Sequence, residues 1–387
     1  MGSHLLLMNS TFKMKKMLFV NVGGAVTDRR TWSGIPFSIY AELQKYYSMD
    51  TFVVSANKTI FDLIYMAYRR IIKREKCLWF YTSRFAKRAS SDLQKYLDSA
   101  EYDVLFVIGS PCITNLETNI PIIYFSDAVV SCMNNYYWFG CQDKEIKEYN
   151  STQKKALDNA NSIVLTSHWA EKATIEDYGI SKDKISVHHF GSNIEVEEVE
   201  HVEHEGFNLL FVGADLNRKG ISVAIEAVKI CNKMDTNHHY TLNVVGGKPE
   251  CDVNPEEVIV HGFINRNNDD ERQKLDYLRA ISDVFILPTR AECAGIVFCE
   301  AAAYGMPSLS FSTGGVPDYI RDGETGYLFD MSSSANDFAS KIVYLANNKN
   351  VLEKMQKNAR AFYESDLNWE QLGASIHEEI CRIIGDK

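Results

Sequence analysis

The sequence lacks the features that mark membrane-spanning, disulfide-bonded and nucleic-acid-binding proteins. No apolar run approaches the ~18 residues that a membrane-spanning helix needs. The nine cysteines are an odd number without a Cys-x-x-Cys pair, which fits neither a disulfide framework nor a zinc site. The net charge of -10 argues against nucleic-acid binding, because affinity for phosphate comes largely from clustered Lys and Arg. We therefore expect a cytoplasmic protein without a bound metal, either free or attached peripherally to the inner face of the cell membrane.

Two common nucleotide-binding motifs are also missing. No Gly-x-Gly-x-x-Gly follows a predicted strand, which argues against a nicotinamide dehydrogenase. A P-loop is absent because Gly247-Lys248 is followed by Pro249. No lysine lies in a context typical of a pyridoxal-phosphate phosphorylase. The sequence therefore predicts no resident cofactor.

The length of 387 residues exceeds the size at which one hydrophobic core usually keeps growing, so two domains are expected. Short β-branched or aromatic runs alternate with longer helical patterns, which is typical of doubly wound α/β domains. The fold class is therefore α/β, with the same Rossmann-like domain occurring twice. The runs predicted to form buried parallel strands are Met17–Val22, Thr51–Val54, Val104–Ile108, Pro121–Phe125 and Ser162–Thr166, then Phe207–Val212, Thr241–Val245, Val258–His261, Val284–Leu287 and Ser308–Ser310.

An acidic stretch separates the two series of strands. Six glutamates crowd residues 195–205 with little apolar periodicity, which is typical of a solvated linker. We place the first domain at residues 14–193, the linker at 194–206 and the second domain at 207–368. A final helical pattern covers residues 369–384, and the sequence pattern alone leaves open which domain it packs on.

The segment of residues 288–303 follows a strand and leads into an alanine-rich helix. This position puts Glu292 on the loop at the carboxyl end of the strand and Glu300 in the first turns of the helix, where open α/β sheets bind ligands. The Glu300 carboxylate can accept two hydrogen bonds from a ribose diol, and backbone N–H groups at the helix start can hold a diphosphate. Two glutamates that only complement the helix dipole are an equally good interpretation. The N–H groups concerned belong to Gly295, Ile296 and Val297.

A second strand, loop and helix segment, residues 211–220, puts Arg218 and Lys219 side by side. A leaving diphosphate carries developing negative charge, which two cations stabilise without a metal ion. The alternative is a solvated pair of cations. That arrangement is electrostatically poor near a helix start, because this end of the helix dipole is already positive. We therefore predict that both side chains act on the diphosphate.

In the first domain, two glycines and one acidic residue follow predicted strands. Gly23-Gly24 permits a sugar or phosphate to approach the backbone, although a plain strand-to-helix turn is the simpler interpretation. Asp127 follows the fourth predicted strand and can bind a sugar hydroxyl or assist catalysis, or it can form an Asx turn or helix cap. His188 and His189 fall on a predicted strand and are expected to be structural.

Together these segments resemble the retaining glycosyltransferases of family 4, which have the GT-B architecture of two facing Rossmann-like domains with a cleft between them. Glu292 and Glu300, with seven residues between them, are similar to the donor-site motif of that family. Gly213, Arg218 and Lys219 resemble its diphosphate-binding element. Further segments that fit the family are residues 166–170, 190–193, 305–317 and 322–328.

The resemblance implies a hexosyltransferase of polysaccharide biosynthesis that needs neither metal nor cofactor. It would move a sugar from a UDP- or GDP-linked donor to a glycan or lipid-linked acceptor. The acceptor would attack from the face of the leaving group, so that the anomeric configuration is retained and the departing phosphate helps to deprotonate the acceptor. The helix over residues 369–384 would cross back onto the first domain.

The resemblance also assigns roles to individual residues. Glu292 would lie near the transferred sugar and Phe263 with Ile264 near the nucleobase. Many members have a histidine close to the donor sugar where this chain has Ser126-Asp127, so the role of Asp127 is open. The predicted catalytic residues are Glu292, Arg218, Lys219 and Asp127. The predicted donor-binding residues are Gly23, Gly24, Gly213, Arg218, Lys219, Phe263, Ile264, Glu292, Ala294, Gly295, Ile296, Val297 and Glu300.

The segment Arg69–Lys95 is strongly basic within this acidic chain. It holds nine Lys or Arg residues and two acidic ones, interleaved with Trp79, Phe80, Tyr81 and Phe85. Cations together with aromatic rings suit an anionic membrane surface or a lipid-diphosphate acceptor. A solvated helical face beside a buried strand is the alternative.

Two other functions keep the same fold. A nucleotide-sugar epimerase of the GT-B type would release an epimerised nucleotide sugar without any acceptor. A non-catalytic scaffold would bind the nucleotide sugar only. The presence of both carboxylates and both cations weighs against the scaffold.

Overall fold

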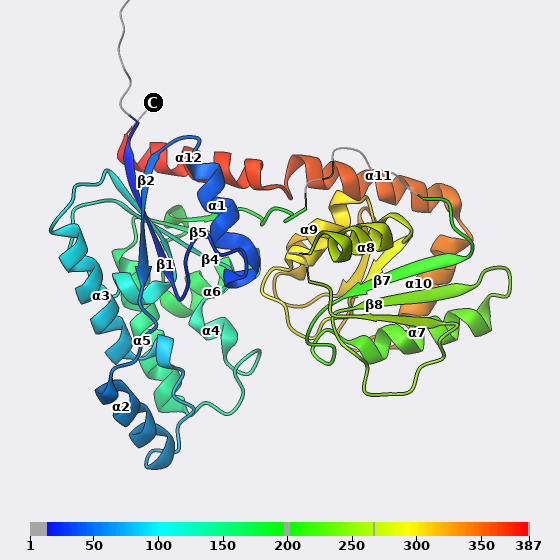
Figure 1. Cartoon of the computed structure of the whole chain (residues 1–387), viewed down its shortest axis with the longest axis horizontal. Helices are drawn as coiled ribbons and strands as arrows, with labels where there is room; N and C mark the ends of the chain where they lie inside the picture. The colour runs from blue at the N-terminus through cyan, green and yellow to red at the C-terminus, as the bar shows by residue number, and fades with distance from the viewer. Residues whose placement is uncertain (1–13, 195, 197–201, 266–267, 386–387) are drawn as a thin grey trace, which may run out of the picture.

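The chain forms two parallel β-sheets, each covered by helices, which confirms the predicted α/β fold class (Figure 1). The structure is a computed structural model that describes residues 14–194, 196, 202–265 and 268–385. The predicted acidic linker, residues 194–206, falls partly outside the described residues.

The first sheet has the strand order β2-β1-β3-β4-β5-β6, and every neighbouring pair is parallel. Its strands are nearly continuous apolar runs because helices cover both faces of the sheet. The strands are β1 (Lys16–Val22), β2 (Ser48–Val54), β3 (Val104–Ile108), β4 (Ile122–Ser126), β5 (Ser162–Leu165) and β6 (Ile185–Val187). The helices are α1 (Ile35–Leu43), α2 (Ile60–Ile71), α3 (Ser83–Leu97), α4 (Val130–Met133), α5 (Asp143–Asn159) and α6 (His168–Tyr178).

The second sheet has the order β12-β11-β10-β7-β8-β9 and is also parallel. This is the order of a doubly wound dinucleotide-binding sheet, in which the direction of winding reverses between β7 and β10. The strands are β7 (Phe207–Val212), β8 (Tyr240–Val245), β9 (Val258–Gly262), β10 (Val284–Ile286), β11 (Ser308–Phe311) and β12 (Gly326–Phe329). The helices are α7 (Ile221–Met234), α8 (Asp269–Ala280), α9 (Ile296–Ala303), α10 (Ala335–Ala346), α11 (Lys349–Ser365) and α12 (Trp369–Ile384).

The structure differs from the sequence prediction at two short strands. The predicted strand around His188 and His189 ends at Val187, so both histidines lie beyond β6. The short strand β12 begins at Gly326 in a segment rich in turn residues, and its apolar pattern is too brief to signal a strand. Both strands lie at sheet edges, where pairing with a single neighbour defines the strand.

The C-terminal helix α12 lies over the first domain beside α1 (Figure 1). The Tyr47 hydroxyl lies 2.8 Å from Nδ1 of His377, and the ring of Tyr46 stacks on the same imidazole at 4.1 Å. The chain therefore forms the first domain and then the second, and its last helix, α12, packs against the first domain again.

Phe190 and Gly191 form the junction of the two domains. The buried Phe190 ring contacts Trp32 and Phe125 of the first domain and Trp369 at the start of α12. Its backbone N–H donates to the Tyr319 hydroxyl of the second domain at 3.0 Å. One apolar core consequently runs from one face of the first sheet through Phe190 into the second domain.

No helix among the described residues is both long and apolar enough to cross a membrane.

A substitution at Gly191 tests the packing at this junction. A Cβ atom at this position would lie 2.2 Å from the backbone nitrogen of Trp369, although the φ angle of Gly191 lies outside the left-handed range. We predict that Gly191→Ala lowers the free energy of unfolding by about 1–3 kcal/mol, measured by denaturant titration, because the chain crossing must shift. The control Gly323→Ala has open space around the added atom and should cost only about 1 kcal/mol of left-handed backbone strain. Wild-type stability in Gly191→Ala would show that α12 does not pack as described.

Candidate active site

A cavity of about 600 Å³ lies between the two domains, at the carboxyl ends of the strands of the first sheet. The loops after β1, β3 and β4 contribute Gly23, Pro111 and Asp127 to its wall. β1 and β3 are neighbours in the sheet although β2 lies between them in sequence, so this is the point where the sheet reverses its winding and where such sheets bind ligands. The second domain closes the cavity with Glu292 and Cys293.

The predicted catalytic residues of the second domain meet at the equivalent point of its own sheet. Arg218 and Lys219 follow β7, and Glu292 follows the neighbouring strand β10. The Lys219 ammonium forms an ion pair with the Glu292 carboxylate, and Nη1 of Arg218 lies 3.7 Å from the same carboxylate. The structure therefore brings these three predicted residues together, and Glu292 among them lines the cavity.

A glycine allows the two loops to approach. Gly220 adopts a φ of +79°, and a Cβ atom there would lie 1.9 Å from the carbonyl oxygen of Pro288. The backbones of the loops are bonded directly, since the N–H of Arg290 donates to the carbonyl of Arg218 at 2.8 Å. Any larger residue at Gly220 would separate Lys219 from Glu292.

Two tyrosines of the first domain hold the Glu292 loop from the other side. The hydroxyl of Tyr136 accepts the backbone N–H of Glu292 at 2.8 Å and lies 3.0 Å from the hydroxyl of Thr313. The hydroxyl of Tyr137 donates to the carbonyl of Ala291 and accepts from Arg218, both at 3.2 Å. These contacts fix the orientation of the predicted donor-site residues relative to the first domain.

The sequence analysis did not identify Tyr136 and Tyr137. Their only sequence signal is a run of four aromatic residues, 136–139, outside any predicted strand. A second contact between the domains was also missed, in which His168 at the start of α6 pairs with Asp318 of the second domain. Both contacts join residues more than 140 positions apart, which local sequence patterns cannot reveal.

Asp127 lines the cavity as a half-buried acid without a cationic partner among the described residues. Burial raises the pKa of the Asp127 carboxyl to about 7, and the nearby Glu292 carboxylate contributes to this rise, while the backbone N–H groups of Asp127 and Ala128 oppose it. A carboxyl with a pKa near 7 can donate or accept a hydrogen bond within the physiological range.

The start of α9 provides free hydrogen-bond donors behind Glu292. Gly295 adopts a φ of +110° and begins the helix without a side-chain cap. Among the described residues, no protein acceptor meets the N–H groups of Ile296 and Val297, as is usual in the first turn of a helix. A first turn of this kind can bind an anion.

Glu300 lies apart from Glu292, although both are on the same segment. Its side chain is buried on α9 and pairs with Arg279 of α8 at 2.9 Å, and it does not line the cavity. Its predicted contact with a ribose diol stays a prediction, now with Arg279 as a competing partner.

The other predicted donor-binding residues differ in their surroundings. Gly23 lines the cavity, whereas a Cβ atom at Gly24 would clash with Thr31. Phe263 is exposed after β9, and the following Ile264 is buried. Gly213 packs against the stem of Lys219, and Ala294 is buried beside α9. Gly23 and Gly24 thus follow β1, whereas the other four residues lie in the loops that follow β7, β9 and β10.

Within the described ranges, no group of three or more His, Cys, Asp or Glu side chains is arranged to hold a metal ion.

The comparisons with known proteins concentrate on the second domain. Residues 193–362 match the family model described as glycosyl transferases group 1. A protein in the cps region of Klebsiella pneumoniae is 25% identical over 217 residues, which cover 53% of this chain and 56% of that protein. The Staphylococcus aureus capsular polysaccharide biosynthesis glycosyltransferase CapM is 26% identical over 247 residues, which cover 57% of this chain and 62% of CapM. The chain thus spans little more than half the length of these relatives.

Solved structures match over nearly the whole chain. A glycosyltransferase from Rickettsia africae superposes with a TM-score of 0.64 and 16% identity, covering 96% of this chain and all of that one. The Anabaena protein HepE, solved in complex with UDP and glucose, gives a TM-score of 0.63 at 13% identity, covering 95% of this chain and 100% of HepE. At these identities the likeness concerns the fold, which is GT-B. Residues 193–362 are therefore similar to the glycosyl transferases group 1 family, and the whole chain has the GT-B fold.

Proposed function

We propose that the protein is a retaining hexosyltransferase of family 4, which moves a sugar from a UDP- or GDP-linked donor to a glycan or lipid-linked acceptor. The observation that supports this proposal most is the meeting of Arg218, Lys219 and Glu292 at the cavity between the domains. Their two loops follow adjacent strands of a nucleotide-binding sheet, where a nucleotide diphosphate is expected.

The two cations are suited to the leaving diphosphate. Lys219 is largely buried, and its charge is balanced by Glu292. A bound diphosphate would offer Lys219 and Arg218 charge-assisted hydrogen bonds that strengthen as negative charge develops on the departing phosphate. The N–H groups at the start of α9 would hold the same phosphates from the opposite side. We propose that these groups provide the charge stabilisation without a metal ion.

Glu292 would then be released toward the sugar. When Lys219 turns to the phosphate, the Glu292 carboxylate is free to accept hydrogen bonds from hydroxyl groups of the transferred hexose. Glu292 is placed for this contact by Tyr136, which holds its backbone N–H. The acceptor would enter from the side of the first domain, past Gly23 and Asp127, and attack from the leaving-group face.

A role in polysaccharide biosynthesis is proposed from the printed description of CapM. The lining of one cavity by residues of both domains supports a reaction in which donor and acceptor meet there.

Nucleotide binding and sugar transfer test the proposal directly. We expect UDP or GDP, but not ADP, to raise the melting temperature, and the shift to persist in EDTA. Transfer from the matching sugar nucleotide should give a product with the anomeric configuration of the donor. Lys219→Ala should slow transfer by about 100-fold or more while weakening donor binding less, because its contact strengthens in the transition state.

The exposed Lys233→Ala is a matched control for lost charge and should behave as wild type. Binding without transfer to any acceptor would favour the scaffold, and epimerised nucleotide sugar in the absence of acceptor would favour the epimerase. A shift that disappears in EDTA would refute the metal-independent mechanism.

Asp127 is expected to make kcat/KM depend on pH. Because burial raises the pKa of Asp127 to about 7, the carboxyl is mostly protonated at pH 6 and mostly ionised at pH 8. The ionised form is the stronger acceptor for a sugar hydroxyl, so kcat/KM should rise with pH through about 7 and then level off. In Asp127→Asn the rate should be lower and this rise should vanish, whereas the exposed Asp98→Asn should keep it. An unchanged profile in Asp127→Asn would remove Asp127 from the mechanism.

Tyr136 is predicted to be a positioning residue. Tyr136→Phe removes the hydroxyl that accepts the Glu292 N–H and contacts Thr313, which is worth about 1–1.5 kcal/mol, or roughly tenfold in rate. We expect kcat to fall by about this factor with little change in the KM for the donor, in steady-state assays. Tyr277→Phe, an exposed tyrosine on α8, serves as the control. A Tyr136→Phe enzyme with wild-type kcat would contradict the positioning role.

A further inference from the structure

Helix α2 exposes most of its apolar side chains and buries charged ones, whereas an ordinary surface helix does the reverse. Seven of the eighteen large apolar side chains that are exposed in the described part of the chain fall within residues 60–72. The exposed fraction reaches 66% for Ile60, 70% for Phe61 and 73% for Ile71. This density marks a surface that is built to be covered. The seven residues, here named the α2 face, are Ile60, Phe61, Leu63, Ile64, Tyr68, Ile71 and Ile72.

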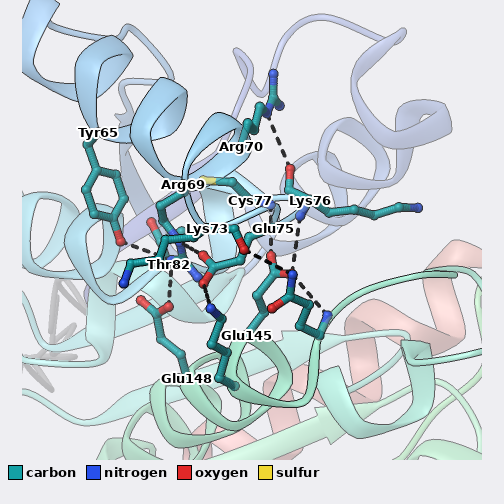
Figure 2. A network of polar contacts seen from close by, with 12 residues as sticks. Tyr65, Arg69, Arg70, Lys73, Glu75, Lys76, Cys77, Thr82, Glu145 and Glu148 are labelled. Carbon is teal, nitrogen blue, oxygen red and sulfur yellow. Dashed lines mark hydrogen bonds and ion pairs between the residues drawn. The ribbon is translucent and has the colours of Figure 1, made fainter.

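The inner side of α2 carries two buried charged residues beside Met66 and is tied to the domain by ion pairs. Arg69 is buried and contacts Glu75, Glu148 at 2.6 Å and the Tyr65 hydroxyl at 3.0 Å (Figure 2). At the other end of the helix, buried Asp62 pairs with Arg84 at 2.9 Å and with Arg88 at 2.5 Å, both on α3. These pairs require the charged side to face inward. The apolar side must therefore face outward.

The turn after α2 is held just as firmly. The Glu145 carboxylate accepts the backbone N–H groups of Lys76 and Cys77 at 3.2 and 2.9 Å (Figure 2). The side-chain amide of Gln142 donates to the carbonyls of Lys73 and Arg74 at 3.1 and 2.7 Å. These hydrogen bonds consequently fix the position of the α2 face on the first domain.

The structure corrects which residues of the basic segment Arg69–Lys95 face outward. Arg69, Arg84 and Arg88 are engaged in ion pairs, and the rings of Trp79 and Phe85 are buried. Four exposed cations remain around the C-terminal end of α2, and none of them forms an ion pair among the described residues. These are Arg70, Lys73, Arg74 and Lys76.

We propose that the α2 face and these four cations dock the protein on an anionic lipid bilayer. A bilayer interface accepts an apolar helix face together with adjacent Lys and Arg that contact lipid phosphates. Residues 58–76 hold six Lys or Arg and two acidic residues, and both acids are buried in the ion pairs described above. A second copy of the chain is a poorer occupant, because a twofold contact would bring two sets of cations face to face.

The α2 face adjoins the candidate active site along the chain. Phe80 and Tyr81, which follow α2 by less than ten residues, line the cavity between the domains. On the neighbouring loop, Gly140 lies beside the Lys76 side chain and the preceding Phe139 is exposed. The same loop carries Tyr136 and Tyr137, which hold the Glu292 loop. The segment that follows α2 therefore connects the α2 face to the wall of the cavity.

Flotation of the purified chain with phospholipid vesicles tests the proposal. The membrane proposal does not depend on the proposed glycosyl transfer, because vesicle binding needs no sugar substrate. We expect binding to vesicles of phosphatidylglycerol with phosphatidylcholine and much weaker binding to phosphatidylcholine alone. Each exposed cation contributes about fivefold to the partition coefficient and each large apolar side chain about tenfold or more. The charge-dependent part should fall in about 1 M salt, where the Debye length is about 3 Å.

Two variants separate the contributions. Phe61→Ser with Ile64→Ser should lower partitioning by about 100-fold or more on any vesicle, and Arg70→Gln with Lys73→Gln by about 25-fold on anionic vesicles only. Met234→Ser with Tyr344→Ser removes two other exposed apolar side chains, from α7 and α10, and should bind as wild type. Because all these side chains are exposed, an unchanged melting temperature verifies folding in each variant.

Three results would overturn the proposal. The first is absence of binding to anionic vesicles at low salt. The second is equal binding by the Phe61→Ser, Ile64→Ser variant and the wild type. The third is a dimer, measured by light scattering, that dissociates in that variant while vesicle binding is absent, since this would assign the α2 face to a second copy.

Discussion

The geometry of the whole molecule depends on the junction at Phe190 and Gly191. Phe190 places its ring among aromatic side chains of the first domain and its backbone against Tyr319 of the second. Gly191 leaves room for the start of α12 at a point where no side chain fits. Since these contacts fix how the domains face each other, the carboxyl ends of the first sheet and the Glu292 loop of the second share one cavity.

Two further contacts preserve that arrangement at the cavity. The tyrosine hydroxyls of residues 136 and 137 bond to the backbone of Ala291 and Glu292, and His168 pairs with Asp318. All of these groups are polar and few in number, whereas the apolar contact is concentrated at Phe190. These few polar bonds therefore hold the Glu292 loop against the first domain.

Ion pairs orient particular side chains in both domains. In the second domain, the ion pair of Lys219 and Glu292 joins the loops that follow β7 and β10. In the first domain, ion pairs of Asp62 and Arg69 have a structural effect, because they turn the apolar side of α2 outward. Neither ion pair adds much to the free energy of unfolding, because the desolvation cost of burying the charges is about as large as the attraction between them. Each determines which group is presented to the surroundings.

Residue pattern alone was sufficient to predict the fold and the three residues that meet between β7 and β10. Strands buried between helices are continuous apolar runs, so β1, β3, β7 and β10 and the loops after them were identified from residue pattern alone. The loops gave Arg218, Lys219 and Glu292, because ligands bind at the carboxyl ends of parallel strands. The edge strand β12 was missed because four residues beginning with Gly326 carry too short a pattern.

Only the tertiary structure decided the partners of these residues. Tyr136 contacts Glu292 across 156 positions, and Glu300 is paired with Arg279 where the sequence pattern suggested an open carboxylate. The basic segment Arg69–Lys95 was identified by composition, but which of its cations are neutralised depends on Asp62, Glu75 and Glu148. Periodicity shows that α2 has an apolar side. The direction in which that side faces depends on ion pairs with α3 and α5, which form only when the chain is folded.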